Sequence, residues 1–286
     1  MTNRSLLSYT SLDNISATID IVFIVSVPLG GIILFKNLLA GLGIGAAKVN
    51  LEITRPQVAL GEVIEGEVRI SGGNVDQQVE QVSITLVLES KYKHDDKYVN
   101  VRHEIGTLKV ADKMVIKAGS PERVIPVRLQ LPYDIPVSWG RTRYYFATNL
   151  DIKNAADPND IDEVVVLPNT YMQMVFDALS MLGFRDKPAS GDYNGRFQQF
   201  EYKPTSFMAR ELDELELYFV AGERELYLVM EIDKKTRGFF GMIADELELD
   251  ERRVSYTIPY SDMQSVEQVA ATLKEIIESE YRKINC

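Results

Sequence analysis

The chain has 286 residues, a length that suggests two domains or one large all-β domain. It carries 31 basic and 42 acidic residues, for a formal net charge of −11, so we do not expect it to bind nucleic acid. The one cysteine is Cys286 and the two histidines are His94 and His103, which excludes an intrachain disulfide and leaves too few ligands for a Cys/His zinc site. We therefore expect no metal, no cofactor and no catalytic residues.

The first 33 residues differ from the rest of the chain. Residues 21–35 are uncharged but contain Pro28, and they fall short of the roughly 20 apolar residues that a membrane helix needs. We interpret residues 1–33 as a hydrophobic N-terminal extension outside the fold. A membrane anchor and a hydrophobic segment packed on the domain or on a partner remain open as alternatives.

From residue 47 to residue 168, apolar and polar residues alternate in short runs separated by turn residues. Val82, Ile84, Leu86 and Leu88, for example, fall on one face of a single extended segment. This period of two is typical of half-buried antiparallel strands. About seven such strands at this spacing predict a β-sandwich.

One helix is predicted after this β region. Asn169 or Thr170 can cap a segment whose apolar residues recur every three or four positions as far as Leu182, and Gly183 can end it. We expect this helix, with the loop that follows, to link two domains over residues 169–195.

The last part of the chain predicts a second, smaller β domain closed by a C-terminal helix. Residues 197–259 return to alternating strands. Ser261 and Gln264 then have the spacing of a capping box. The helix that follows should dock through one apolar stripe, formed by Val266, Val269, Ala270, Leu273, Ile276, Ile277 and Tyr281.

Two segments resemble arrestin-like domains. Residues 60–70 read LGEVIEGEVRI, which is similar to the strand-turn-strand of that fold, and residues 131–138 read LPYDIPVS, which is similar to its Leu-Pro to Pro-x-Ser connection. The order and spacing of the two segments strengthen the resemblance.

More specifically, residues 34–286 resemble the bacterial sporulation-control family called SpoOM, or stage-zero-M. The resemblance is carried by four segments: Leu34-Phe35-Lys36-Asn37-Leu38-Leu39-Ala40, Gly43-Ile44-Gly45-Ala46-Ala47-Lys48-Val49, Ile70-Ser71-Gly72-Gly73, and Glu231-Ile232-Asp233-Lys234-Lys235-Thr236-Arg237-Gly238-Phe239-Phe240-Gly241.

The resemblance implies a mainly β fold of two arrestin-like β-sandwich domains, with a linker helix and a C-terminal helix. The domains would span residues 34–168 and 196–286. It also implies a non-enzymatic, cytoplasmic, regulatory protein that acts on the onset of sporulation or on cell division through protein partners. A homodimer formed by pairing of sheet edges is compatible with such a fold.

Two other functional classes remain as alternatives. The first is a membrane-tethered envelope scaffold that is anchored by residues 21–35 and contacts the bilayer there. The second is a hydrolase on a β-sandwich, which would need a cleft that holds a carboxylate with a strongly shifted pKa.

A basic and aromatic cluster near the end of the second β region is the candidate partner contact. It consists of Lys234, Lys235, Arg237, Phe239 and Phe240, and such a cluster suits an acidic partner or a membrane surface. The alternative is that the two phenylalanines pack in the core while the cations stay solvated.

Three further motifs are better explained without ligand chemistry. The glycines of residues 41–46 lead into a strand rather than a helix, which argues against a dinucleotide site. The acidic residues of 157–163 lack the pattern of a calcium loop, and we expect a solvated loop there. The carboxylates between residues 211 and 216 alternate with leucines, and we expect them on the solvent face of a strand; they are Glu211, Asp213, Glu214 and Glu216.

Overall fold

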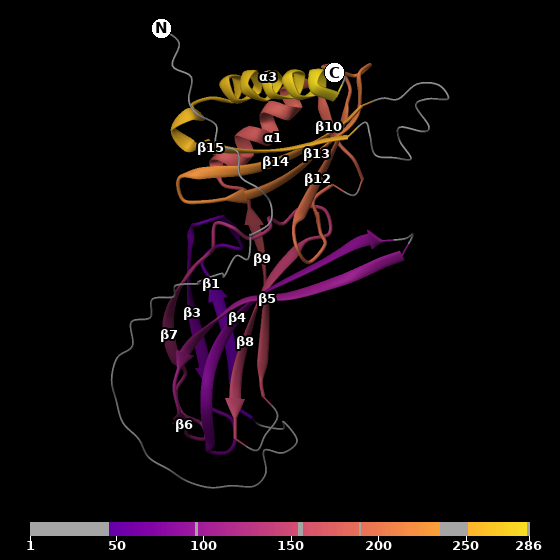
Figure 1. The fold of residues 1–286 in the computed structure, drawn as a ribbon. Coiled ribbons are helices and arrows are strands. Elements are labelled where there is room, and N and C mark those ends of the chain that lie inside the picture. The colour runs from indigo at the N-terminus through magenta and orange to yellow at the C-terminus, as the bar shows by residue number, and fades with distance from the viewer. Residues whose placement is uncertain (1–45, 95–96, 154–156, 189, 235–250, 285–286) are drawn as a thin grey trace.

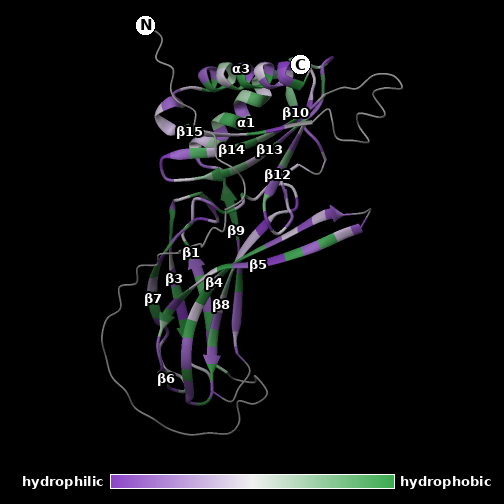
Figure 2. Ribbon diagram, viewed as in Figure 1, coloured by the Kyte–Doolittle hydropathy of each residue, from purple (hydrophilic) through white to green (hydrophobic). Residues whose placement is uncertain are grey.

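The structure is a computed structural model that describes residues 46–284, apart from residues 95–96, 154–156, 189 and 235–250. Strands dominate the described residues, and two α-helices lie in the second half of the chain (Figure 1). The predicted mainly β class is therefore confirmed. Figure 2 shows the strands striped by alternating hydrophilic and hydrophobic residues, the pattern that predicted them.

The N-terminal half, residues 46–168, is a sandwich of two sheets. One sheet has the antiparallel order β1-β3-β7, formed by β1 (Lys48–Ile53), β3 (Val63–Ser71) and β7 (Arg123–Gln130). The other has the order β2-β9-β8-β4-β5, with β6 also paired to β4. Its strands are β2 (Gln57–Ala59), β4 (Gln77–His94), β5 (Lys97–Ala111), β6 (Met114–Ile116), β8 (Arg143–Ile152) and β9 (Asn159–Leu167).

The core of the sandwich comes from the alternating apolar residues of both sheets. Ile64 and Val68 of β3 and Val82, Ile84 and Leu88 of β4 are all at most 1% exposed. Burial of such aliphatic side chains is the main stabilising contribution of the sandwich. The predicted inward face of β4 is thus confirmed.

The C-terminal half, residues 169–284, is a single antiparallel sheet with two helices on one face (Figure 1). The sheet order is β10-β12-β13-β14-β15, with β11 paired to β12. Its strands are β10 (Phe184–Asp186), β11 (Asp192–Tyr193), β12 (Gln198–Pro204), β13 (Leu212–Ala221), β14 (Glu225–Lys234) and β15 (Glu251–Pro259). The helices, α1 (Thr170–Leu182) and α3 (Val266–Ile284), also pack on each other, so they form the layer that covers the sheet.

The predicted boundaries of α1 are confirmed. The side chain of Asn169 accepts a hydrogen bond from the N–H of Met172 at 2.9 Å, and Gly183 ends the helix with a φ of 87°. A positive φ at this position favours glycine because it has no Cβ.

The predicted capping box of the C-terminal helix is wrong by one turn. Ser261 lies in a short 3-10 helix, Tyr260–Asp262, and the α-helix starts only at Val266. Ser265 provides the cap, because its Oγ accepts from the N–H of Gln268 at 3.2 Å. The same S-x-x-Q spacing therefore occurs four residues later. Five of the seven residues of the predicted apolar stripe are buried, with Leu273 and Ile277 both 0% exposed, whereas Val266 and Tyr281 at its two ends are partly buried.

A hairpin formed by β4 and β5 projects beyond the sandwich (Figure 1). The pairing of β4 with β8 ends at Glu89 and Arg143, whereas the pairing of β4 with β5 continues to His94 and Lys97. We call the described residues of this hairpin, 90–94 and 97–103, the arm. Because the pairing with β8 ends there, the structure describes no strand of this sheet along the arm other than β4 and β5.

Candidate interaction sites

A buried glutamine joins the two halves of the chain. Gln198, at the start of β12, is 6% exposed. Its Oε1 accepts from the N–H of Val137 at 2.8 Å, and its Nε2 donates to the carbonyl of Val137 at 2.8 Å and to that of Gly191 at 2.7 Å. Val137 itself is 0% exposed, so this amide satisfies backbone groups that water does not reach.

A hydroxyl chain fixes the base of the arm to the second half. The hydroxyls of Ser90 and Thr142 lie 3.0 Å apart, and Thr142 donates to the carbonyl of Gly191 at 3.1 Å. Ser90 in turn accepts from the N–H of Tyr193 at 3.0 Å. All four residues are buried, so each hydroxyl has a defined direction of donation.

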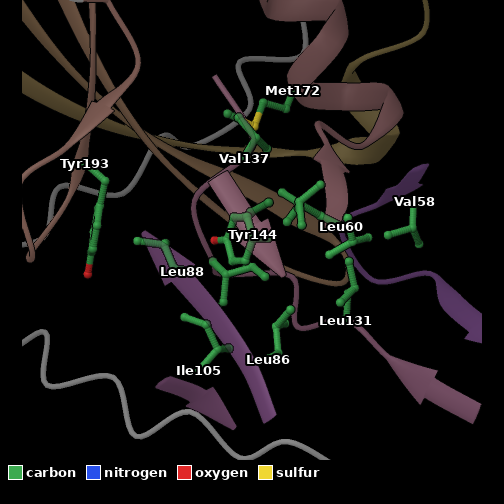
Figure 3. Close-up of a cluster of buried hydrophobic side chains, with 14 of the residues drawn as sticks. Val58, Leu60, Leu86, Leu88, Ile105, Leu131, Val137, Tyr144, Met172 and Tyr193 are labelled. Carbon is green, nitrogen blue, oxygen red and sulfur yellow. The ribbon is translucent and has the colours of Figure 1, made fainter. Parts of the chain in front are cut away.

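An aromatic cluster lies beside these hydrogen bonds. The ring of Trp139 lies 5.0 Å from Phe176 of α1 and 6.0 Å from Phe200 of β12, between ring centroids. Gly191 packs so close to this ring that an added Cβ would lie 2.3 Å from it, and its φ of +86° also favours glycine. Figure 3 shows Met172 of α1 next to Val137 at the same place. We call the contacts that Ser90 and residues 137–142 make with residues 190–200 the joint.

A cation links the joint to the arm. The guanidinium of Arg141 forms an ion pair with Asp192, whose side chain is 8% exposed. The same guanidinium lies 4.7 Å from the centroid of the Tyr98 ring and donates to the Tyr98 hydroxyl at 3.0 Å. Lys91 lies over the same ring at 4.8 Å. Cation–π contacts of this kind attract a cation to the ring face, so Tyr98 has two cations around it.

The strand β5 is the outermost strand of its sheet, and its arm portion is exposed. Among the described strands its only hydrogen-bonded neighbour is β4. All residues from Lys97 to Glu104 are exposed except Val101, which is partly buried. Tyr98 and Val99, with exposed fractions of 50% and 37%, are among the more exposed large apolar side chains of the described chain.

Two carboxylates predicted in a solvated loop instead face the sandwich interior. The acidic residues from Asn159 onward belong to β9, so the loop expectation is wrong for them. Asp160 accepts from the N–H of Leu51 on β1 at 2.8 Å. Burial, and then the neighbouring Asp160, raise the pKa of Asp162 to about 7.

The carboxylates of β13 lie on the face of the C-terminal sheet opposite the helices. Glu201, Glu216 and Glu231 are direct neighbours across three strands. Burial is the main cause that raises the pKa of Glu216 to about 7, and the neighbouring glutamates add to it. Its position on a strand was predicted, but this degree of burial was not.

An open groove of about 500 Å³ crosses the outer face of the three-stranded sheet. Its carboxylates pair with arginines: Glu52 and Glu67 with Arg69 at 2.9 and 2.7 Å, and Glu65 with Arg128 at 3.2 Å. Asp162 and Glu216 do not line this groove. The hydrolase alternative requires a cleft that contains a carboxylate with a shifted pKa. In the described part of the chain, the carboxylates with raised pKa values lie outside this groove. Within the same ranges, no group of three His, Cys, Asp or Glu side chains is placed to hold a metal ion.

The predicted basic and aromatic cluster falls mostly outside the described residues. Lys234 ends β14, where its backbone pairs with Leu212. The other four members, Lys235, Arg237, Phe239 and Phe240, lie outside the described ranges, as do residues 41–45 and the hydrophobic residues 21–35. Among the helices that the structure describes, none has the length and apolarity needed to cross a membrane.

Sequence reasoning missed the joint; it placed a hairpin or loop tip at residues 93–96 but did not predict that this hairpin projects beyond the sandwich. The joint brings together residues that are far apart in sequence, 61 positions for Val137 and Gln198 and 103 for Ser90 and Tyr193. A signal for the arm was present, because the strand around Val82 to Leu88 continues with few turn residues as far as His94.

Comparison with known proteins agrees with the resemblance seen in the sequence. The family model described as SpoOM protein matches residues 35–236. The sporulation-control protein spo0M of Bacillus subtilis (strain 168) is 30% identical over 252 residues, which cover 85% of this chain and 97% of that protein. The crystal structure of Spo0M from Bacillus subtilis superposes with a TM-score of 0.71 at 27% identity, and the match covers 83% of this chain and all of that one. The chain therefore belongs to the SpoOM family of sporulation-control proteins.

Proposed function

We propose that the chain is a non-enzymatic regulator in sporulation control and that it acts by binding other proteins at the free edge of β5. The family supports the regulatory role. The observation that supports the mode of action is the arm, a long exposed strand whose outer edge has no partner strand among the described residues. An unpaired edge can accept a strand from another chain through backbone hydrogen bonds.

The other described edge strands are less suited to this role. β2 and β10 have three residues each. β7 contains Pro126, which lacks an N–H, and on β1 the N–H of Leu51 is already bound by Asp160. β15, with nine residues, is the main competitor of β5, which has 15.

Shortening the arm tests the proposal. Replacing residues 92–99 by Asn-Gly leaves Lys91 and Asn100, which pair with each other, joined by a two-residue turn. Each form is expressed in cells, crosslinked and purified, and the captured proteins are identified by mass spectrometry. We expect the full chain to capture a discrete partner that the shortened chain loses, with an unchanged circular dichroism spectrum. Capture of the same partner by both forms would contradict binding at the arm.

We also propose that residues 34–168 and 196–286 are the two domains, that the protein is cytoplasmic, and that residues 1–33 are dispensable for partner binding. A version that begins at Leu34 tests the last two points in a fractionation and crosslinking experiment. Retention of the partner and of a soluble fraction by this version supports them. Membrane capture by the full chain alone would support the tethered scaffold instead.

A further inference from the structure

We propose that the arm binds an acidic, extended segment of a partner protein, which adds to β5 as a strand and places its carboxylates over the cationic face of the arm. This inference rests on the proposed function and specifies the chemistry of the partner. Three observations carry it: the charge of the arm, the difference between its two faces, and the way the joint holds its base.

The arm is basic on an acidic protein. Between residues 90 and 103 the sequence has four cations, Lys91, Lys93, Lys97 and Arg102, and two carboxylates, Asp95 and Asp96. Over the whole chain acidic residues outnumber basic ones, 42 to 31, whereas in the arm basic residues outnumber acidic ones. The guanidinium of Arg141 also lies on Tyr98, although its charge is balanced by Asp192. Complementary charge attracts and orients an acidic partner, whereas the rest of the chain has an excess of acidic residues.

The two faces of the arm differ. Residues that oppose each other across the hairpin share a face, and the register pairs Lys93 with Tyr98, Lys91 with Asn100, and Glu89 with Arg102. This face therefore carries three cations and has two carboxylates at its base, where Glu89 accepts from the Tyr145 hydroxyl at 3.2 Å and Glu104 pairs with Arg102 at 3.0 Å. The opposite face carries Tyr92 and Val99, with His94 and Lys97 beyond them toward the tip, and with Ser90 and Val101 at the joint.

An added strand would present its side chains alternately to these two faces. The best match is thus a segment in which acidic residues alternate with apolar or β-branched ones. Carboxylates on one side lie next to Arg102 of β5 and, one strand further in, face Lys91 and Lys93 of β4, while apolar side chains on the other side lie next to Val99. Backbone hydrogen bonds to β5 provide affinity, and the alternating pattern provides specificity.

The joint prepares the arm for binding. Ser90 is tied to Tyr193 and Thr142, and Tyr98 is tied to Arg141, which is itself fixed by Asp192. A surface that is ordered before binding loses less entropy when the partner arrives. The arm therefore presents its edge in one orientation relative to both halves of the chain.

A peptide titration tests the inference on the full chain. The probe is a fluorescent peptide of about ten residues in which glutamate alternates with valine or threonine, a typical strand length. Two matched peptides have glutamine in place of glutamate, or proline at the centre. Affinity is measured by anisotropy at two salt concentrations, and hydrogen exchange locates the protected amides.

Two protein variants complete the design. The first removes the cations of one face by Lys91→Gln, Lys93→Gln and Arg102→Gln. The control removes three exposed lysines at the far end of the same domain by Lys109→Gln, Lys113→Gln and Lys117→Gln; in the native chain these pair with Asp112, Glu80 and Asp76. Both variants change the net charge equally.

We expect the glutamate peptide to protect amides of residues 97–104 and to bind more weakly at high salt. The arm variant should lose about tenfold in affinity and the control variant little, since the arm variant removes three cations from the peptide site and the control variant removes none from it. The glutamine and proline peptides should bind weakly. Three results would each overturn the inference. They are equal affinity for the glutamate and glutamine peptides, an equal loss of affinity in both protein variants, and unchanged affinity for the peptide with the central proline.

The outcome separates this inference from the proposed function. If the shortened arm loses its partner in cells while the glutamate peptide does not bind, β5 is a docking edge for a partner of other chemistry and only this inference fails. If the shortened arm keeps its partner and the peptide does not bind, both fail.

Discussion

Replacing Gln198 by leucine should weaken the joint more than any other single change to its polar groups. The side chain is buried and makes three hydrogen bonds to the backbone of Val137 and Gly191, at 2.7 to 2.8 Å. Leucine has a similar volume but cannot pair with them. The N–H and C=O of Val137 would then be buried without this partner, whereas the carbonyl of Gly191 keeps its bond from Thr142.

The magnitude follows from these three bonds. A net contribution of roughly 1 kcal/mol for each predicts a loss of at least about 3 kcal/mol in the free energy of unfolding, and the two unpaired backbone groups of Val137 can only increase it. The matched control is Gln199→Leu, because Gln199 is the next residue and is only partly buried. We expect the control to change stability by less than about 0.5 kcal/mol, as is usual for positions outside buried networks.

Urea denaturation followed by circular dichroism and by Trp139 fluorescence measures both effects. Because Trp139 is the only tryptophan and lies in the joint, its signal should change before or with the loss of secondary structure in Gln198→Leu. Equal stability of the two glutamine variants would refute the reasoning, because it would mean that the amide of Gln198 contributes nothing to the joint.

Three further changes test other parts of the structure. Leu273→Glu places a charge at a position that is 0% exposed on the inner face of α3, and it should cost several kcal/mol, seen as a lower denaturation midpoint; an unchanged midpoint would contradict the docking of this helix. The pKa of Asp162 is raised from 3.8 to about 7, so the folded state holds this proton more tightly than the unfolded chain and stability should fall as the pH rises from about 4 to about 7. In Asp162→Asn this fall should be smaller in a pH series of thermal midpoints, and an identical slope in both proteins would argue against the assignment. Trp139→Ala should cost about 3 kcal/mol, since it removes a ring that packs on Phe176 and Phe200, whereas Trp139→Phe should cost less; equal losses in calorimetry would show that ring packing is not the cause.

Local sequence patterns predicted the elements whose stability depends on near neighbours. The alternation from Val82 to Leu88 predicted the inner face of β4, and Asn169 and Gly183 marked both ends of α1. The sequence pattern assigned the capping box to Ser261 instead of Ser265 because both serines have a glutamine three residues later. The chain there first forms a 3-10 turn, in which the N–H of Met263 binds the carbonyl of Tyr260 at 3.2 Å.

The candidate sites depended on contacts that a sequence pattern does not encode. Asp160 and Asp162 resemble loop residues by composition, yet the first is held inside the sandwich because it accepts the N–H that β1, an edge strand, cannot pair with another strand. The joint similarly needs both halves to be folded before Gln198 can reach Val137. The free edge of β5 becomes visible only when the sheet order is known, since many strands of a sandwich have the same alternation.

The most direct test of the account is hydrogen exchange on the full chain with and without the partner that the crosslinking experiment captures. The account predicts that binding slows exchange at amides of residues 97–104 on β5 and leaves those of β15 unchanged. Protection of β15 or of the helical face, with β5 unaffected, would contradict strand addition at the arm.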